Sequence, residues 1–186
     1  MLNVRHWTLL GIILAMAAMR LVPHPPNFTP LGAMALFGGA HFASRRAAFA
    51  VPLAAMFLSD LVLGHSVYHF GWYHATMPYV YASFVLTVCL GLWLRQHRSP
   101  LAVSGSALAA ALLFFLVSNF GVWLQWNMYP KTFEGLMACY VAAIPFFGYT
   151  LTGNLVYSLV LFGGFALAQR HVAGLRDEAA LGLAHG

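Results

Sequence analysis

The chain has 186 residues, of which 61% are hydrophobic and only 7% are charged. A soluble domain of this size does not hide so much apolar surface with so few charged residues to cover it. The composition therefore predicts an all-α integral membrane protein that forms a single membrane domain over residues 1–186. Nine Lys and Arg against four acidic residues, without a basic run, give no indication of nucleic-acid binding. Two cysteines are too few for a disulfide framework.

The first predicted span, residues 7–22, leads into a segment at 20–30 that contains four prolines. Thr29 and Pro30 then suit the N-cap and the first position of a second helix. The second apolar run, residues 31–42, has 12 residues. At about 1.5 Å per residue it reaches about 18 Å, short of the ~30 Å hydrocarbon layer. The proline-rich segment must then lie partly at membrane depth, where irregular backbone is tolerated only against protein or a cavity.

The rest of the chain alternates between long apolar runs and short polar segments. Pro52 is expected to kink the third span, and Pro145 interrupts an apolar stretch at 136–147 that is expected to form a separate partial helix. The sequence thus predicts a bundle of six transmembrane helices plus this partial helix. The six predicted spans cover residues 7–22, 31–42, 47–63, 78–94, 101–123 and 150–168.

The distribution of basic residues predicts the orientation in the membrane. With the N-terminus inside, seven of the nine basic residues are cytoplasmic, and only Arg20 and Lys131 are outside. Both termini are then cytoplasmic, and the segments at 20–30, 64–77 and 124–135 all open on the outer face. The seven residues expected on the cytoplasmic side are Arg5, Arg45, Arg46, Arg95, Arg98, Arg170 and Arg176.

Asp60 is the single acidic residue inside an apolar span. An ionisable group inside the membrane costs about 2.5–3.5 kcal/mol on insertion scales, so it usually faces a partner or a cavity. Arg20, at the outer end of the first span, is at a similar depth and is the expected partner. The pair either ties two helices together or contacts a substrate or a proton, and the sequence leaves both open.

His65, His69 and His74 share one predicted outer loop. His65 and His69 have the i,i+4 spacing with which two imidazoles can hold a transition metal on a helix, but the loop offers no carboxylate or thiol to complete a site. Histidines at the membrane interface are the simpler interpretation. The sequence contains no phosphate-binding glycine loop, no nucleophile–base pair and no paired carboxylates, so we do not expect an enzyme.

Several blocks of the chain resemble a family of bacterial membrane proteins related to the substrate-binding S-components of energy-coupling-factor vitamin transporters. Within that group, the chain is most similar to solitary cobalamin transporters of the BtuM type. The resemblance covers residues 20–164. The blocks that carry it are RLVPHPPNFTPLGAMALFGGAHF, PLAAMFLSDLVLG, HATMPYVYASF, FFLVSNFGVWL, YPKTFEGLMACYVAAIPFF and TGNLVYSLVLFGG.

The resemblance implies an S-component-like fold in the bacterial inner membrane and uptake of a vitamin-like molecule, with cobalamin or another corrinoid first. The substrate would lie under the three outer segments, where aromatic and polar side chains gather. Cofactors are not expected, although cobalamin is a candidate substrate, and its cobalt could be bound by Cys139 or Cys89. The residues expected to line the substrate site are His24, Asn27, His65, Tyr68, Trp72, His74, Trp123, Trp126, Asn127 and Tyr129.

The sequence leaves the energy source and two other functions open. No nucleotide-binding motif is present, so use of ATP would require a separate energy-coupling module in addition to the lipid bilayer and the small-molecule substrate. One alternative is a haem- or metal-handling membrane protein that uses the outer histidines. The other is an accessory membrane protein without transport, for which we expect a packed interior with no cavity under the outer segments.

Overall fold

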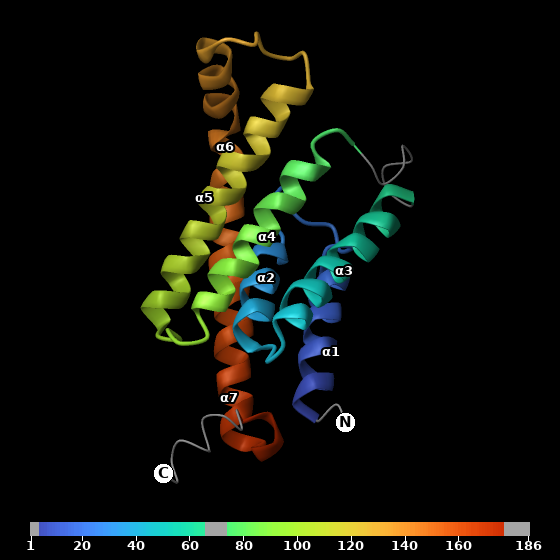
Figure 1. Ribbon diagram of the computed structural model, residues 1–186, viewed down its shortest axis with the longest axis vertical. Helices are drawn as coiled ribbons and strands as arrows, with labels where there is room; N and C mark the ends of the chain where they lie inside the picture. Colours follow the sequence, from blue (N-terminus) through green and yellow to red (C-terminus); the bar gives the residue numbers. More distant parts are fainter. Residues whose placement is uncertain (1–3, 66–73, 177–186) are drawn as a thin grey trace.

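A computed structural model describes residues 4–65 and 74–176, and these residues form an all-helical bundle (Figure 1). Its helices are α1 (Val4–Met19), α2 (Leu31–His41), α3 (Arg45–Leu63), α4 (Met77–Trp93), α5 (Pro100–Gln125), α6 (Phe133–Ser158) and α7 (Gly164–His171). A π-helical turn, Leu159–Gly163, joins α6 to α7 without a break, and a short 3₁₀ turn, Ala173–Leu175, follows. Counting α6 through α7 as one element, the described residues form six helices.

Three of these helices are long and apolar enough to cross a membrane: Arg45–Leu63, Pro100–Gln125 and the continuous Phe133–His171. The other three are also apolar but shorter. At about 1.5 Å per residue, α1 and α4 reach about 24 and 26 Å, whereas α2 reaches only about 16 Å. The short second helix expected from the sequence is therefore present, although Pro30 rather than Thr29 occupies its N-cap and no side-chain cap is formed there.

The partial helix predicted at 136–147 and the separate span at 150–168 are wrong. Both belong to one helix that begins at Phe133 and continues through Pro145 to His171. Pro145 removes one backbone hydrogen bond, but a proline does not end a helix that neighbouring structure holds in place. Here α6 packs along α5, and Tyr140 on α6 donates a hydrogen bond to the Leu116 carbonyl of α5 (2.8 Å).

The short helix α2 lies at the centre of the bundle. All of its residues are buried, and it contacts α1, α3, α4, α5 and α6. Glycine makes the closest of these contacts possible: a Cβ on Gly39 would lie 2.5 Å from the Val88 carbonyl oxygen of α4, and one on Gly91 would lie 2.4 Å from the Leu36 carbonyl oxygen. The backbones of α2 and α4 therefore touch, and larger side chains at these two positions would separate them.

The C-terminal end of α2 is closed by arginine side chains. Arg95 donates to the carbonyls of Gly39 (3.0 Å), Phe42 (2.6 Å) and Ala43 (3.3 Å). Arg5 donates to the His41 carbonyl, and Arg98 donates to the Ala40 carbonyl. The last carbonyls of a helix have no partner within it and carry partial negative charge, so these guanidinium groups satisfy and neutralise them.

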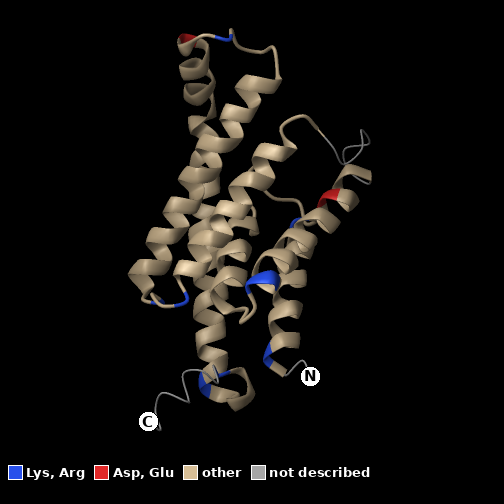
Figure 2. Cartoon of the chain, viewed as in Figure 1, with Lys and Arg blue, Asp and Glu red and all other residues tan. Residues whose placement is uncertain are grey.

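Figure 2 shows that most of the basic residues lie in one half of the bundle, toward the end where α1 begins and α7 ends. The loop between α5 and α6, which contains Lys131, lies at the opposite end. Three of the arginines that the charge count assigned to one membrane side are thus also the residues that close α2. We refer below to the end of the molecule that contains Arg5, Arg95 and Arg98 as the basic end.

Candidate functional site

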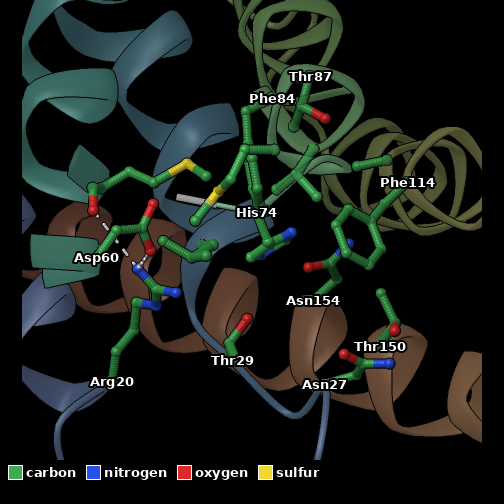
Figure 3. Close-up of a pocket in the computed structure, with 16 residues that line it drawn as sticks. Arg20, Asn27, Thr29, Asp60, His74, Phe84, Thr87, Phe114, Thr150 and Asn154 are labelled. Carbon is green, nitrogen blue, oxygen red and sulfur yellow. Dashed lines mark hydrogen bonds and ion pairs between the residues drawn. The ribbon is translucent and has the colours of Figure 1, made fainter. Parts of the chain in front are cut away.

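The interior contains a cavity of about 240 Å³ beside the N-terminal end of α2 (Figure 3). Five helices and the segment before α2 enclose it. Ala110 and Phe114 lie near the middle of α5, and Thr150 and Asn154 lie near the middle of the continuous helix from Phe133 to His171, so the cavity is deep in the bundle. Its lining comprises Arg20, Asn27, Thr29, Leu31, Gly32, Met56, Asp60, His74, Met77, Val80, Phe84, Thr87, Ala110, Phe114, Thr150 and Asn154.

The charged part of the cavity wall is the ion pair predicted from the sequence. Nη1 of Arg20 lies 2.6 Å from Oδ1 of Asp60, and the two side chains are 13% and 5% exposed. The same Nη1 donates to the Ser59 hydroxyl (2.6 Å), and the Tyr81 hydroxyl donates to Oδ2 of Asp60 (2.7 Å). Both carboxylate oxygens are therefore engaged, and the pair joins the end of α1 to α3 and α4.

The N-terminal end of α2 forms another part of the wall through Leu31 and Gly32. The first helical hydrogen bond runs from the Met34 N–H to the Pro30 carbonyl (2.8 Å), so the N–H groups of residues 31–33 have no acceptor within the helix. The preceding segment reaches this point through Asn27, whose φ of 65° is in the left-handed region that asparagine tolerates. The proline-rich segment thus separates α1 from α2, and its residues Asn27 and Thr29 line the cavity.

Asn154 connects the cavity wall to the surrounding helices. Its amide donates to the Ala107 carbonyl of α5 (3.3 Å), and it is 4% exposed. Its carbonyl oxygen lies against Gly32, where a Cβ would approach it to 2.3 Å. Gly32 is therefore required for this close contact between α2 and α6.

Apolar side chains complete the cavity. Met56, Val80, Phe84 and Phe114 line it together with the polar groups above. A second cavity of about 190 Å³ adjoins it and shares Asn27, Val80, Phe114 and Thr150 as lining residues. An interior surface that is mostly apolar with a few fixed polar groups is typical of a small-molecule site.

Comparison with protein families gives one match, which covers residues 1–178 with a family of unknown function, DUF6580. The chain belongs to this family. Comparison with curated proteins and with solved structures gives no match. The DUF6580 family description assigns no activity, so the function of this member has to be argued from its site.

The structure brings four of the residues predicted at functional positions to the cavity: Arg20, Asp60, Asn27 and His74. His74 is exposed, and its Nδ1 lies 2.7 Å from the Thr76 hydroxyl. His24 and His65 do not line either cavity. Tyr68, His69 and Trp72 lie outside the described residues.

The predicted residues at the end of α5 and in the loop after it do not line the cavities. Trp126 is 12 residues beyond Phe114, or about 18 Å along a helix. Trp123 instead donates from its indole to the Pro130 carbonyl in the loop (2.9 Å). Lys131 donates to the carbonyls of Trp123 and Trp126 and so closes the C-terminal end of α5. Asn127 and Tyr129 belong to the same loop and do not line the cavities either.

The two cysteines proposed as cobalt ligands line neither cavity. Cys139 is buried and its thiol donates to the Asn119 carbonyl (3.5 Å), whereas Cys89 is exposed on α4. Over residues 4–65 and 74–176, no group of three or more His, Cys, Asp or Glu side chains is close enough to hold a metal ion.

Sequence reasoning missed most of the helical residues that line the cavity, including Thr87, Phe114 and Thr150. The usable signal was the occurrence of hydroxyl and amide side chains inside apolar spans, as at Asn154. These polar side chains also form bonds within and between helices: Thr87 donates to the Ser83 carbonyl one turn before it (2.8 Å). The pattern alone therefore does not separate a ligand contact from a structural bond.

Proposed function

We propose that this protein is an inner-membrane protein that captures a small, vitamin-like molecule and carries it into the cell. The observation that carries the proposal is the internal cavity beside the N-terminal end of α2, at mid-depth in the long helices. Transporters commonly bind substrate near the middle of the bilayer, where a helix is interrupted and its end faces the ligand. The proline-rich segment and short α2 supply such an interruption.

The cavity also favours capture over the alternative of an accessory protein with a packed interior. Its volume of about 240 Å³ is just below the range of about 300–1,000 Å³ found for drug-sized ligands. A compact vitamin or related acid matches this volume. A corrinoid is the larger alternative, and it would require the two adjoining cavities to merge and widen.

The proposal can be tested by growth and uptake. A bacterial strain that needs an external vitamin and lacks the matching transporter is provided with this chain, and the test is repeated for several small vitamins and for cyanocobalamin. We expect rescue, with accumulation of the labelled compound, for at least one small vitamin. Failure to rescue or accumulate any compound, with the protein present in the membrane, would contradict the proposal.

A matched pair of substitutions on α4 connects this activity to the cavity. Val80 lines both cavities, so Val80→Phe places a ring in the ligand space. Val85 is 38% exposed and lines neither cavity, so Val85→Phe adds the same bulk on the outside of the helix. We expect Val80→Phe to abolish uptake and Val85→Phe to preserve it. Equal uptake by the two variants would show that the cavity is not the binding site.

A further inference from the structure

The hydrogen-bonding groups around the cavity are unevenly used. Asp60, the single carboxylate in the wall, accepts from Arg20 on one oxygen and from Tyr81 on the other. Arg20, the single guanidinium, makes all of its contacts through Nη1: to Ser59, to Asp60 and, at 3.5 Å, to the Met56 carbonyl. Within the described part of the chain, its Nε and Nη2 donate to no protein group. Both oxygens of the carboxylate are thus occupied, whereas two nitrogens of the guanidinium remain available as donors.

The unused edge of Arg20 faces the ligand space. Figure 3 shows that Asp60 holds one side of the guanidinium of Arg20. The terminal nitrogen that is not bonded to Asp60 is directed toward the space between His74, Thr29 and Asn154. A planar guanidinium with one edge fixed and one edge free is suited to bind a carboxylate through the free edge. The Arg20 side chain is only 13% exposed, so water screens this interaction weakly.

The N-terminal end of α2 also favours a negatively charged ligand. This end carries partial positive charge, its first N–H groups have no acceptor within the helix, and Leu31 and Gly32 line the cavity. Apolar side chains, among them Met56, Phe84 and Phe114, also line the cavity. The cavity therefore combines the donor groups of Arg20 and of the start of α2 with apolar surface for the body of a ligand.

We propose that the ligand of this cavity is a small carboxylic acid with a flat or short apolar body, whose carboxylate binds the free edge of Arg20 beside the N-terminal end of α2. This inference rests on the proposed capture function and specifies its substrate class. A cationic ligand would find no free carboxylate, because both oxygens of Asp60 are engaged. A neutral amide of the same shape would lose the charge-assisted bonds.

The substrate class is tested with pairs of acids and amides that share one body. The full chain is purified in detergent, and its melting temperature and binding isotherm are recorded with benzoate and benzamide and with nicotinate and nicotinamide. We expect the acids to raise the melting temperature and to bind about tenfold or more tightly than the amides, the ratio expected for a lost bond to a charged group. Binding must disappear in Val80→Phe and persist in Val85→Phe.

The same conservative substitution at two arginines then identifies the carboxylate site. Arg20→Lys keeps a positive charge beside Asp60 but lacks the second donor edge, so the protein should remain folded and bind the acids about tenfold more weakly. Arg95→Lys, at the basic end and outside the cavity, should leave their affinity unchanged. An unchanged affinity in Arg20→Lys would overturn the proposed contact.

The outcomes separate this inference from the proposed function. Amides that bind in the cavity as tightly as the acids, and lose binding in Val80→Phe, would overturn the carboxylate class while supporting capture of a small molecule. Binding of neither acids nor amides, together with failure of the vitamin panel to rescue growth, would overturn both. Acid binding that survives in Val80→Phe would place the carboxylate elsewhere and overturn the inference alone.

Discussion

The two ends of α2 both lie inside the protein, but side chains satisfy the backbone hydrogen-bonding groups at one end and not at the other. At the C-terminal end, Arg5, Arg95 and Arg98 donate to the last carbonyls and close the helix. At the N-terminal end, no side-chain cap is formed and the helix faces a cavity. A buried helix end without a cap is costly, so its presence beside an open space points to a ligand as the missing partner.

The largest effect on stability should come from the ion pair at the cavity end. In Asp60→Leu, the Arg20 charge remains with little solvent access and without its counter-charge, which typically costs about 3–5 kcal/mol. The double variant Arg20→Met/Asp60→Leu removes both charges and should be more stable than Asp60→Leu alone. Thermal unfolding in detergent measures both. Additive losses in the double variant would show that the two side chains do not depend on each other.

A smaller loss is expected at the closed end. Arg95→Ala removes three hydrogen bonds to carbonyls at the end of α2, but these bonds are exposed or only partly buried, so water replaces much of what is lost. We expect a total loss of about 1.5–3 kcal/mol, the contribution of one bond to a charged group. We expect thermal stability to fall while the affinity for a cavity ligand stays the same. If Arg95→Ala weakened ligand binding as strongly as Arg20→Lys, the distinction between the two ends of α2 would be lost.

A single methyl group at the contact between α2 and α4 should lower the stability of the protein. Gly39→Ala places a Cβ against the Val88 backbone oxygen, which cannot move aside, and overpacking of this kind costs about 1–3 kcal/mol. Gly105→Ala is the control, because nothing lies within 4 Å of its Cβ position. It should be neutral or slightly stabilising in a helix. Similar melting temperatures for the two variants would argue against the close approach of α2 and α4.

The same change at the open end of α2 should cost less. In Gly32→Ala the new Cβ meets the side chain of Asn154 rather than backbone, and that side chain can shift into the cavity. The expected loss is about 1 kcal/mol, the contribution of the Asn154–Ala107 hydrogen bond, together with weaker ligand binding. A loss larger than that of Gly39→Ala, measured by thermal unfolding, would mean that the cavity end is as tightly packed as the centre.

The sequence predicted correctly those features that depend on the type and position of only a few residues. A 12-residue apolar run after four prolines predicts a short helix that starts below the membrane surface, and the cavity lies beside that start. One acidic and one basic side chain at similar depth predict a pair, and Arg20 and Asp60 form it. In both cases few residues in the chain could fulfil the requirement.

Other features depend on neighbours that the sequence does not specify. In a membrane protein both the lipid-facing and the core-facing sides of a helix are apolar, so periodicity does not show that Phe114 faces the cavity and Leu116 does not. The arginines at 95 and 98 indicate orientation in a charge count, and their bonds to α2 become evident only when the helices are packed. The same holds for Pro145, which would break an isolated helix.

The central claim is that the N-terminal end of α2 faces a space that anions can enter. The direct measurement uses a chain with Cys89→Ser and Cys139→Ala, into which one cysteine is introduced by Thr29→Cys, at the cavity, or by Ser83→Cys, which lines no cavity and is 1% exposed. Each is treated with negatively and positively charged thiol reagents of equal size. We expect the cysteine at position 29 to react faster with the negative reagent and the cysteine at 83 to react with neither. Equal rates for both reagents at position 29, or no reaction there, would contradict the claim.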